Sequence, residues 1–570
     1  MWGKPMRPRA SLCKALLIVV LPMLLAASSQ LLAQESCTPQ ESLTRLQELA
    51  CGKFSKPNLN PTELRVVRSA ASGEVAWGGE EIDQPEAKTD AATEAAYHRS
   101  SNDPANAKEY DWRRRRSVRA DLIRWLCEDE EARKLVDEHG IDIVGAWIDG
   151  VVDLSYLHIN FPVILWQSRI PNGIKVTSAE MSDLQLVGSW IGEDNIAPPG
   201  QEQIALKGEG LTVHGNVLLS DGFRAFGQVD LYGAKIDGQL YCTEGRFSHP
   251  GGDSLRLRLA SIGGETELNG GFSSDGVVDL VSAKINGDLL LDRAKFSGRF
   301  QNGLKARSLT AHALHWTNVK PSSQTELDLS NATVGIFDDD EDSWPHPGNL
   351  HIDGFVYGSH GMATEAASRL KWLHLQPSVP VLLQPYKQLA KVFLDNGQDA
   401  DAIAVLVAKE GAEPAWQEPM LGIRHLLLGY IRLIVRKTLK ITIDYGYHPM
   451  LALLWIAAFV AIGTYTFHRG YWMRLVIPTD HEAYETFIKT GNPPAGYQPF
   501  NSFVYSLENF VPLIELHQAG YWLPYPQDSQ QNNTKRSGGM LRWYLWLHIL
   551  LGWIFTSILV GGLAQLIRNG

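Results

Sequence analysis

A twelve-residue pattern that recurs at a fixed interval limits the folds open to this chain more than any other feature. It reads VDLYGAKIDGQL at 229–240, VDLVSAKINGDL at 278–289 and, in degraded form, LDLSNATVG at 327–335, so the interval is the same both times. A fixed period of this length is typical of repeated units that cannot bury their apolar faces alone and therefore stack. We expect the middle of the chain to be such a stack.

The alternation of residue types within the repeat predicts extended strands with one buried face. The inward set is Val229, Leu231, Ala234, Ile236, Leu240 and Cys242, and its counterpart in the next unit is Val278, Leu280, Ala283, Ile285, Leu289 and Leu291. Val152 and Ile174 begin similar runs at a shorter step, close to half the interval, which indicates two coils per repeat. The sequence therefore predicts a mainly β fold, a right-handed parallel β-helix over 140–358, with Phe223 and Phe272 stacked inside it.

Residues 1–33 have the organisation of a signal peptide, with basic residues before the apolar run ALLIVVLPMLLAA (15–27). The cleavage site is loose, so an uncleaved anchor is the alternative. In both cases we expect the following domain to leave the cytoplasm, where disulfides can form. A Cys37–Cys51 bridge then requires residues 37–41 to fold back along the next helix.

Two segments flank the predicted β-helix on its N-terminal side and one on its C-terminal side. Residues 34–117 are predicted to be partly disordered, because 70–112 are rich in small and polar residues without apolar periodicity. Residues 118–139 have helical spacing and are predicted to cap the first coil. Residues 359–411 predict a helical hairpin linker, turned at Gly397, that packs on the last coil.

Two apolar stretches near the C-terminal end, 450–467 and 543–567, are long enough as helices to reach bilayer thickness. His548 is expected at the membrane interface, near the end of the second. Basic residues in the loop 468–541 favour a cytoplasmic loop and hence an exported β-helix. Basic residues also precede the first stretch, and we interpret 420–441 as a basic helix lying on the membrane surface.

Composition and motifs exclude several classes of function. A net charge of −11 with 20% charged residues argues against a nucleic-acid partner. The zinc-protease, serine-hydrolase and Walker-type motifs do not occur. GEGLTVHG (208–215) starts like a dinucleotide loop but lacks the third glycine and lies in the repeats. No catalytic, cofactor-binding or metal-ligating residue is assigned, and no cofactor is expected.

Two groups of carboxylates remain to be explained. Asp230, Asp279 and Asp328 recur at one register, every second coil, which would place them roughly 9–10 Å apart, near the separation in inverting glycosidases. The repeat explains them more simply as a solvated ladder on the outer face. Asp338, Asp340 and Asp342 alternate in DDDEDSW (338–344) without the glycine and distal glutamate of a calcium loop, so an acidic turn is expected.

The stretch FNSFVYSLENFVPLIELHQAGYW (500–522) is amphipathic and lies between the two apolar stretches. Two spans enclosing such a segment have the outline of a two-span pore. A potassium filter needs a carbonyl run of the TVGYG kind between the spans, and the lookalike Tyr445-Gly446-Tyr447 falls before the first span. A divergent channel is therefore an alternative rather than the leading interpretation.

Several motifs follow one another in a distinctive order: LIRWLCEDEEARKLVDEHGIDIVGAWIDGVVDLS, VDLYGAKIDGQL, RLKWLHLQ, PYKQLAKVFLDNGQDADAIAVL, DYGYHPMLALLW and FVYSLENFVPLIEL, and then a last helix that contains Gly-Trp. This order resembles that of a bacterial family of repeat-bearing membrane proteins. The resemblance covers about residues 119–567, and members often carry the label "membrane-associated oxidoreductase". It implies a pentapeptide-like parallel β-helix followed by membrane helices, and it brings no catalytic residues with it.

Taken together, these patterns predict an exported β-helix anchored in the bacterial inner membrane, with the β-helix in the periplasm. Its expected role is that of a scaffold or binding surface for a protein or glycan, with the lipid bilayer as its other partner. A polysaccharide-modifying enzyme, a membrane-associated oxidoreductase and a divergent two-span channel are the alternatives.

Overall fold

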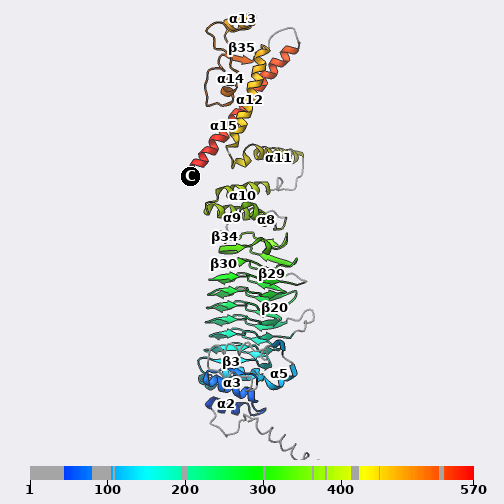
Figure 1. Ribbon diagram of the computed structural model, residues 1–570, viewed down its shortest axis with the longest axis vertical. Helices are drawn as coiled ribbons and strands as arrows, with labels where there is room; N and C mark the ends of the chain where they lie inside the picture. Colours follow the sequence, from blue (N-terminus) through cyan, green and yellow to red (C-terminus); the bar gives the residue numbers. More distant parts are fainter. Residues whose placement is uncertain are drawn as a thin grey trace, which may run out of the picture. The chain divides into compact units, whose positions relative to one another are not determined.

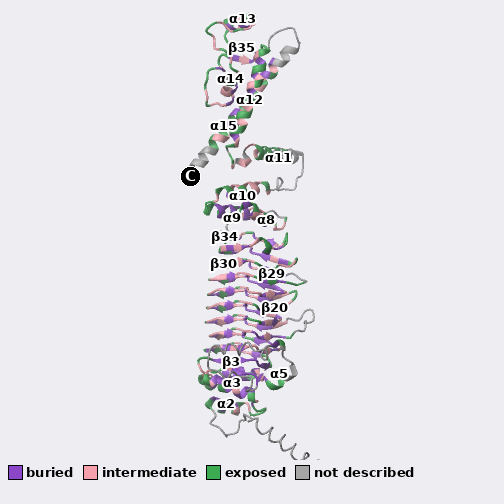
Figure 2. Cartoon of the chain, in the orientation of Figure 1, coloured by how far each residue is buried: buried purple, intermediate pink, exposed green. Residues whose placement is uncertain are grey.

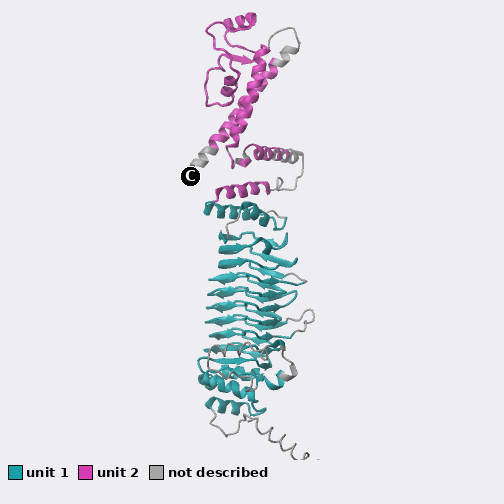
Figure 3. Ribbon diagram, in the orientation of Figure 1, with its two compact units in different colours: residues 1–397 teal, residues 398–570 magenta. Residues whose placement is uncertain are grey.

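The computed structural model describes residues 44–79, 104–106, 109–193, 203–298, 302–361, 365–378, 382–412, 423–448, 450–524 and 532–569. The predicted signal peptide and Cys37 lie outside these residues. The chain divides into two compact units, residues 1–397 and 398–570 (Figure 3).

Unit 1 contains a parallel β-solenoid, whose short strands stack in three sheets (Figure 1). Sheet A holds β1 (Ala76–Trp77), β3 (Ile141–Val144), β6 (His158–Ile159), β7 (Val163–Trp166), β10 (Glu180–Met181), β11 (Leu184–Gln185), β14 (Thr212–Val213), β15 (Val217–Leu218), β18 (Lys235–Ile236), β19 (Leu240–Tyr241), β22 (Ser261–Ile262), β23 (Thr266–Glu267), β26 (Lys284–Ile285), β27 (Asp288–Leu290), β30 (Thr310–Trp316), β32 (Thr333–Asp339) and β34 (Val356–His360). Sheet B holds β2 (Ser117–Arg119), β4 (Trp147–Asp149), β8 (Arg169–Ile170), β12 (Trp190–Ile191), β16 (Arg224–Phe226), β20 (Arg246–Ser248), β24 (Ser273–Ser274) and β28 (Lys295–Phe296). Sheet C holds β5 (Val152–Asp153), β9 (Ile174–Lys175), β13 (Ile204–Lys207), β17 (Gln228–Asp230), β21 (Asp253–Arg256), β25 (Val277–Asp279), β29 (Asn302–Lys305), β31 (Thr325–Asp328) and β33 (Leu350–His351).

The register of the sheets confirms the predicted stacking. Val152 pairs with Ile174, so the shorter step seen in the sequence is one coil. Val229 and Val278 both pair with Leu255, so the full repeat spans two coils. The mainly β fold and its parallel coils are confirmed, while the right-handed sense of the coil stays a prediction.

A residue with positive φ turns the chain at the same corner of every coil, between sheet C and sheet A. These residues are Tyr156, Ser178, Gly210, Gly233, Leu259, Ser282, Ser308, Asn331 and Gly354, with φ between 50° and 71°. Left-handed backbone costs roughly 1–2 kcal/mol for a residue with a Cβ. The stacking of the coils must outweigh that cost at the non-glycine corners, which explains why glycine is frequent there but not required.

The inside of the solenoid is a column of apolar side chains, as predicted. Buried residues recur along the strands of the stacked coils (Figure 2). Ile236 is 1% exposed, whereas Lys235 beside it is exposed. Cys242 is fully buried and free, which confirms it as a core residue. Phe223 and Phe272 share one aromatic stack, but Phe247 lies between them at 5.4 and 5.2 Å from their ring centres.

The N-terminal end of the solenoid is more ordered than the sequence suggested. α2 (Arg45–Lys53) and α3 (Pro61–Ser72) are helices with complete capping boxes, and β1 pairs with β3. The prediction of a flexible segment from residue 70 was therefore wrong for 70–79, where Ala70, Ala76 and Trp77 are buried. The sequence signal failed because this segment adds one short strand to an existing sheet instead of forming an amphipathic element of its own.

The predicted capping helix is interrupted. Residues 117–119 are strand β2, and two helices follow, α6 (Ala120–Glu128) and α7 (Glu130–Leu135). Asp129 between them has extended backbone, and its carboxylate accepts hydrogen bonds from the amides of Glu131 and Ala132. This side-chain cap starts a new helix where the apolar spacing alone predicted a continuous one. α5 (Glu109–Arg115) and η2 (Pro104–Asn106) complete the described part of this end.

Two helices cover the last coils. α8 (Ala366–Leu373) is fixed by Arg369, whose guanidinium lies 2.6 Å from Asp339 with both side chains buried. α9 (Gln384–Asp395) donates a hydrogen bond from Gln388 Nε2 to the carbonyl of Tyr357, at 2.7 Å. Both helices meet the end of the sheet, where exposed strand edges would otherwise pair with other chains.

Unit 2 is helical, with one small antiparallel sheet. Its elements are α10 (Asp399–Ala412), α11 (Ile423–Ile443), η4 (Asp444–Gly446), α12 (Leu451–Trp472), β35 (Val476–Pro478), α13 (His481–Thr490), α14 (Ser502–Phe510), β36 (Trp522–Pro524) and α15 (Asn532–Asn569). Leu451–Trp472 and Gly538–Gly561 are long and apolar enough to cross a membrane, and only 22% and 28% of their windows are buried. Such low burial is unlike the core helix of a soluble protein, which is mostly covered.

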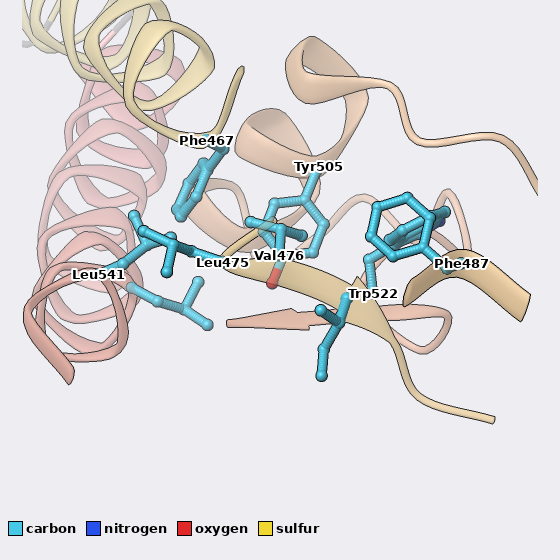
Figure 4. Close-up of a cluster of buried hydrophobic side chains, with 9 residues drawn as sticks. Phe467, Leu475, Val476, Phe487, Tyr505, Trp522 and Leu541 are labelled. Atoms are coloured by element: carbon cyan, nitrogen blue, oxygen red, sulfur yellow. The ribbon is translucent and has the colours of Figure 1, made fainter. Parts of the chain in front are cut away.

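An aromatic cluster joins the connecting loop of unit 2 to the two long helices (Figure 4). Phe467 from α12, Tyr505 from α14 and Trp522 from β36 are each at most 1% exposed. Leu541 from α15 and Val476 from β35 complete the contact. The loop predicted over 468–541 is thus a folded part of unit 2 wherever the structure describes it.

Candidate binding face

The three predicted aspartates do not form a solvated ladder, because they are buried. Asp230, Asp279 and Asp328 are 2%, 1% and 8% exposed. Each accepts a hydrogen bond from the backbone amide two residues ahead, at 3.0, 2.9 and 3.0 Å. These amides lie in the left-handed corner that follows sheet C, so each aspartate stabilises the turn.

Each of these aspartates also has an arginine partner. Arg256 lies 2.9 Å from Asp230, Arg258 lies 2.7 Å from Asp279, and Arg307 lies 3.4 Å from Asp328. Burial raises the pKa of Asp230, and the nearby Arg256 opposes that shift. Buried carboxylates held by turns and arginines are closed to a substrate, so the glycosidase-like spacing is a consequence of the repeat.

The neighbours of these aspartates in sheet C explain why the sequence repeats every second coil and not every coil. From the middle of the sheet onward, the outward position of successive coils is Asp230, Arg256, Asp279, Lys305, Asp328 and His351. We call these six residues the sheet C ladder. Opposite charges on neighbouring strands attract, so the ladder neutralises itself.

In sheet B, the outward position on successive strands is rich in basic residues, unlike that of sheet C. Its nine successive members are Ser117, Trp147, Arg169, Trp190, Arg224, Arg246, Ser273, Lys295 and Lys320. We call them the sheet B column. None of these nine described positions is acidic, and two pairs of adjacent positions carry like charges, Arg224 with Arg246 and Lys295 with Lys320.

Aromatic rings lie between the basic groups of the sheet B column. The Arg224 guanidinium lies 4.0 Å from the Trp190 ring centre, and Arg169 lies 5.8 Å from it on the neighbouring coil. Phe226 packs edge-on to Trp190 at 6.0 Å. Cation–π contacts of this kind hold arginine side chains over rings while keeping their charge. The column is therefore a row of fixed cations and flat apolar surfaces.

Histidines and carboxylates dominate one stretch of the third face, on sheet A. His214 Nε2 lies 2.9 Å from Glu180 and its Nδ1 lies 3.1 Å from Asp237, while His158 reaches the other Glu180 oxygen at 2.8 Å. Hydrogen bonds to these carboxylates raise the pKa of His214, and the histidines lower the pKa of Glu180. A general acid needs a raised carboxyl pKa, so the shift in Glu180 runs the wrong way for that role.

The remaining predicted positions fall as follows. GEGLTVHG (208–215) crosses a corner into strand β14, and no helix follows it. Asp340 caps η3 (Glu341–Ser343) through the Ser343 amide, and Asp342 lies within η3, which agrees with an acidic turn. Asp338 instead lies in strand β32 and contacts His315 at 3.2 Å, so the predicted turn begins later than expected. Cys51 is disulfide-bonded and Cys127 is free; Cys37, the predicted partner of Cys51, is not among the described residues. Among the residues that the structure describes, no three potential ligands gather to hold a metal ion.

His548, which was predicted to lie at the membrane interface, is packed inside unit 2, and its depth in a membrane stays a prediction. It is 1% exposed, and its ring contacts Phe467 and Phe510. His548 lies well inside the candidate span Gly538–Gly561, because the helix begins earlier than its apolar stretch. Its Nε2 lies 3.1 Å from the Ser506 carbonyl, so it donates a hydrogen bond to α14.

Sequence reasoning missed the sheet B column. Its residues are separated by unequal intervals, because the coils differ in length, and arginines next to tryptophans resemble any solvated surface. Alignment of the coils on their corner residues would have placed Arg224, Arg246 and Trp190 in one column. No protein-family model, curated protein or solved structure matches the chain.

Proposed function

We propose that this chain is a membrane-anchored β-solenoid that binds an acidic polysaccharide along sheet B. The observation that carries the proposal is the sheet B column, with five basic residues and no acidic one among its nine described positions. Basic groups that recur along one face attract a polyanion, and the exposed members Arg246 and Lys295 can bind it directly.

The geometry of the column suits a linear polymer with carboxylates at regular intervals. Coils repeat at about 4.8 Å, so successive basic groups of the column lie one or two coils apart, at roughly 5 or 10 Å. Arginine can bind a carboxylate through two parallel N–H donors. The rings of Trp190 and Phe226 supply flat apolar surface against which the apolar face of a sugar ring packs.

We place the protein in the bacterial inner membrane, with the solenoid in the periplasm. The signal-peptide-like segment 1–33 and the two candidate spans support this topology. α11 supports it too, because its basic residues accompany exposed apolar ones, such as Tyr430, Ile434 and Ile441, as in a helix on a lipid surface.

The topology can be tested with reporter fusions. A reporter that is active only outside the cytoplasm should work after Gly411 and fail after Thr490. The reverse pattern would place the solenoid in the cytoplasm and remove periplasmic polysaccharides from consideration.

The binding proposal can be tested on the full-length protein in detergent, with polygalacturonate as the probe and neutral dextran as its control. Arg246 and Lys295 are exposed members of the column. Replacing both with Gln removes two charge-assisted contacts, each worth about 1.5–3 kcal/mol, so affinity should fall at least tenfold. The matched control replaces Lys235 and Lys284, two exposed lysines of sheet A, with Gln and should leave affinity unchanged.

Three results would contradict this function: no preference for polygalacturonate over dextran, equal losses in both double variants, or no loss in either. Tighter binding of polyphosphate than of polygalacturonate would instead assign the column to phosphate-bearing partners. Among the described residues, the enzyme alternative is supported only by the exposed row of histidines and carboxylates on sheet A. No set of described residues supports the redox label of the resembled family.

A further inference from the structure

Residues 501–518 of unit 2 form a loop whose two ends are tied together. The side chain of Gln518 accepts a hydrogen bond from the Asn501 amide and donates one to the Pro499 carbonyl, both at 3.1 Å. Glu508 accepts hydrogen bonds from the amides of Gln518 and Ala519, at 2.7 and 3.1 Å. The chain therefore leaves and returns at the same level, and we call 501–518 the re-entrant segment.

The helix of this segment, α14, reaches the middle of both candidate spans. Ser506 Oγ donates a hydrogen bond to the carbonyl of Val460 at 2.9 Å, and Val460 lies near the centre of α12. At the end of α14, Phe510 stacks on Phe459 at 5.7 Å. A Cβ on Gly552 of α15 would collide with the Phe510 carbonyl, so glycine is needed for this approach. α14 therefore ends at mid-span, at the depth of Val460 and Gly552.

The return from this depth is not helical. α14 ends at Phe510, and residues 511–517 contain no helix or strand. Leu513 is 75% exposed and Leu516 is 39% exposed. Within the described part of the chain, no acceptor lies against the backbone amides of Leu513, Glu515 or Leu516.

Such a segment cannot face lipid. In hydrocarbon each unsatisfied backbone group costs several kcal/mol, and irregular backbone at membrane depth is tolerated only where protein buries it or where it lines a water-filled cavity. The described residues of one copy of unit 2 provide neither around 511–517. We propose that several copies of this chain associate in the membrane so that their 511–517 segments surround a water-filled pore that conducts cations.

The charge of the segment decides the sign of the permeant ion. Between 500 and 522 the sequence holds Glu508 and Glu515 but no lysine or arginine. Glu508 is occupied by the amides at the base of the loop, whereas Glu515 is exposed on the returning part of the segment. A ring of such carboxylates, one from each copy, favours cations in a pore. This inference rests on the proposed membrane anchoring but not on the binding of a polysaccharide.

The test uses the full-length protein in planar bilayers with a gradient of potassium chloride. We expect currents whose reversal potential lies toward that of potassium. Glu515→Gln should move the reversal potential toward zero, while Glu482→Gln, an exposed carboxylate of α13, should leave it unchanged. Gly552→Leu should abolish the current because it displaces α14, with an unchanged α-helical circular dichroism spectrum of the same preparation as evidence of folding.

Cross-linking in native membranes supplies the second measurement. A ladder of two or more copies is expected. Three results would each overturn the pore. They are a band of monomer size only after cross-linking, an oligomer that passes no current, and a current that neither Glu515→Gln nor Gly552→Leu alters. Loss of polysaccharide binding with the current intact would overturn only the proposed function of the solenoid.

Discussion

The sheet C ladder and the sheet B column are built by the same coils, yet they handle charge in opposite ways. In the sheet C ladder each aspartate is followed by a basic residue on the next coil, from Asp230 to His351. In the sheet B column Arg224 is followed by Arg246. One column is neutral through its own stacking, and the other keeps like charges side by side.

The difference shows how a repeat separates stability from binding. The aspartates of sheet C are buried and hold the corners of the coils, so their charge serves the fold. In sheet B, Arg169 donates a hydrogen bond to the Gly192 carbonyl at 2.8 Å, whereas Arg246 and Lys295 are exposed. Mutations in the two faces should therefore have separable effects on stability and on binding.

The largest effect is expected inside the coil, where both faces are anchored. Ile236→Asp places a charge in the apolar column and should destabilise the solenoid by several kcal/mol. Lys235→Ala, one residue away and outward, should change stability by no more than about 0.5 kcal/mol. Thermal unfolding of the full-length protein checks both variants, and equal shifts in Tm would refute the inward and outward assignment.

Asp142 gives the next largest effect, because it is a covered aspartate without the arginine that sheet C supplies. Burial raises its pKa to about 7, and one of its carboxylate oxygens has no hydrogen-bond partner among the described residues. Its folded pKa lies above its unfolded pKa, so folding favours the protonated form. The contribution of Asp142 to stability should be greatest at low pH and fall as the pH rises from about 4 to about 7.

Asp142→Asn should remove that loss. At about pH 8 the variant should be more stable than the native protein by on the order of 2–4 kcal/mol, and at about pH 4 the two should be equal. Urea unfolding at both pH values measures the difference, with Asp121→Asn on the exposed side of α6 as the control. A variant that is no more stable at the higher pH would show that water reaches the carboxylate.

The direct comparison of the two faces uses one residue from each. Asp279→Asn keeps the acceptor for the Val281 amide but removes the charge that faces Arg258, so it should cost about 1–2 kcal/mol, less than a fully buried pair because Arg258 is 41% exposed. Arg246→Gln should cost no more than about 0.5 kcal/mol, since it relieves repulsion with Arg224. Urea midpoints that fall equally would break the separation of stability from binding.

How far the sequence could predict this molecule depends on what each signal reports. The fixed interval of the repeat correctly predicted the stacked coils and the inward-facing residues, because Ile236 and Cys242 are both buried. The interval did not predict that Asp230 is buried. Alternation shows whether a side chain points into or out of the coil, but not whether other residues cover an outward side chain, as the corner and Arg256 cover Asp230. The burial of His548 was not predicted for a similar reason: the length of an apolar stretch indicates a possible span, but not which side chains pack against it.

The sheet B column was beyond the sequence because it exists only between coils. Trp190 and Arg224 are far apart in the chain, with strands β13, β14 and β15 between them, yet they are paired neighbours in sheet B. Only the register brings the ring and the guanidinium to 4.0 Å. Sites of this kind are built by long-range pairing, so their residues carry no local motif.

The smallest expected effect concerns pH and sharpens the contrast between sheet B and sheet A. Hydrogen bonds to Glu180 and Asp237 raise the pKa of His214, so its contribution to stability is present at low pH and lost as the pH rises through that raised value. Glu180→Gln should lower the pKa of His214 toward the ordinary histidine value, as read from its ring resonances by NMR. Arginines do not titrate in this range. The affinity of sheet B for polygalacturonate should therefore stay constant between about pH 6 and pH 8. If the affinity falls as His214 loses its proton, the polyanion binds on sheet A instead.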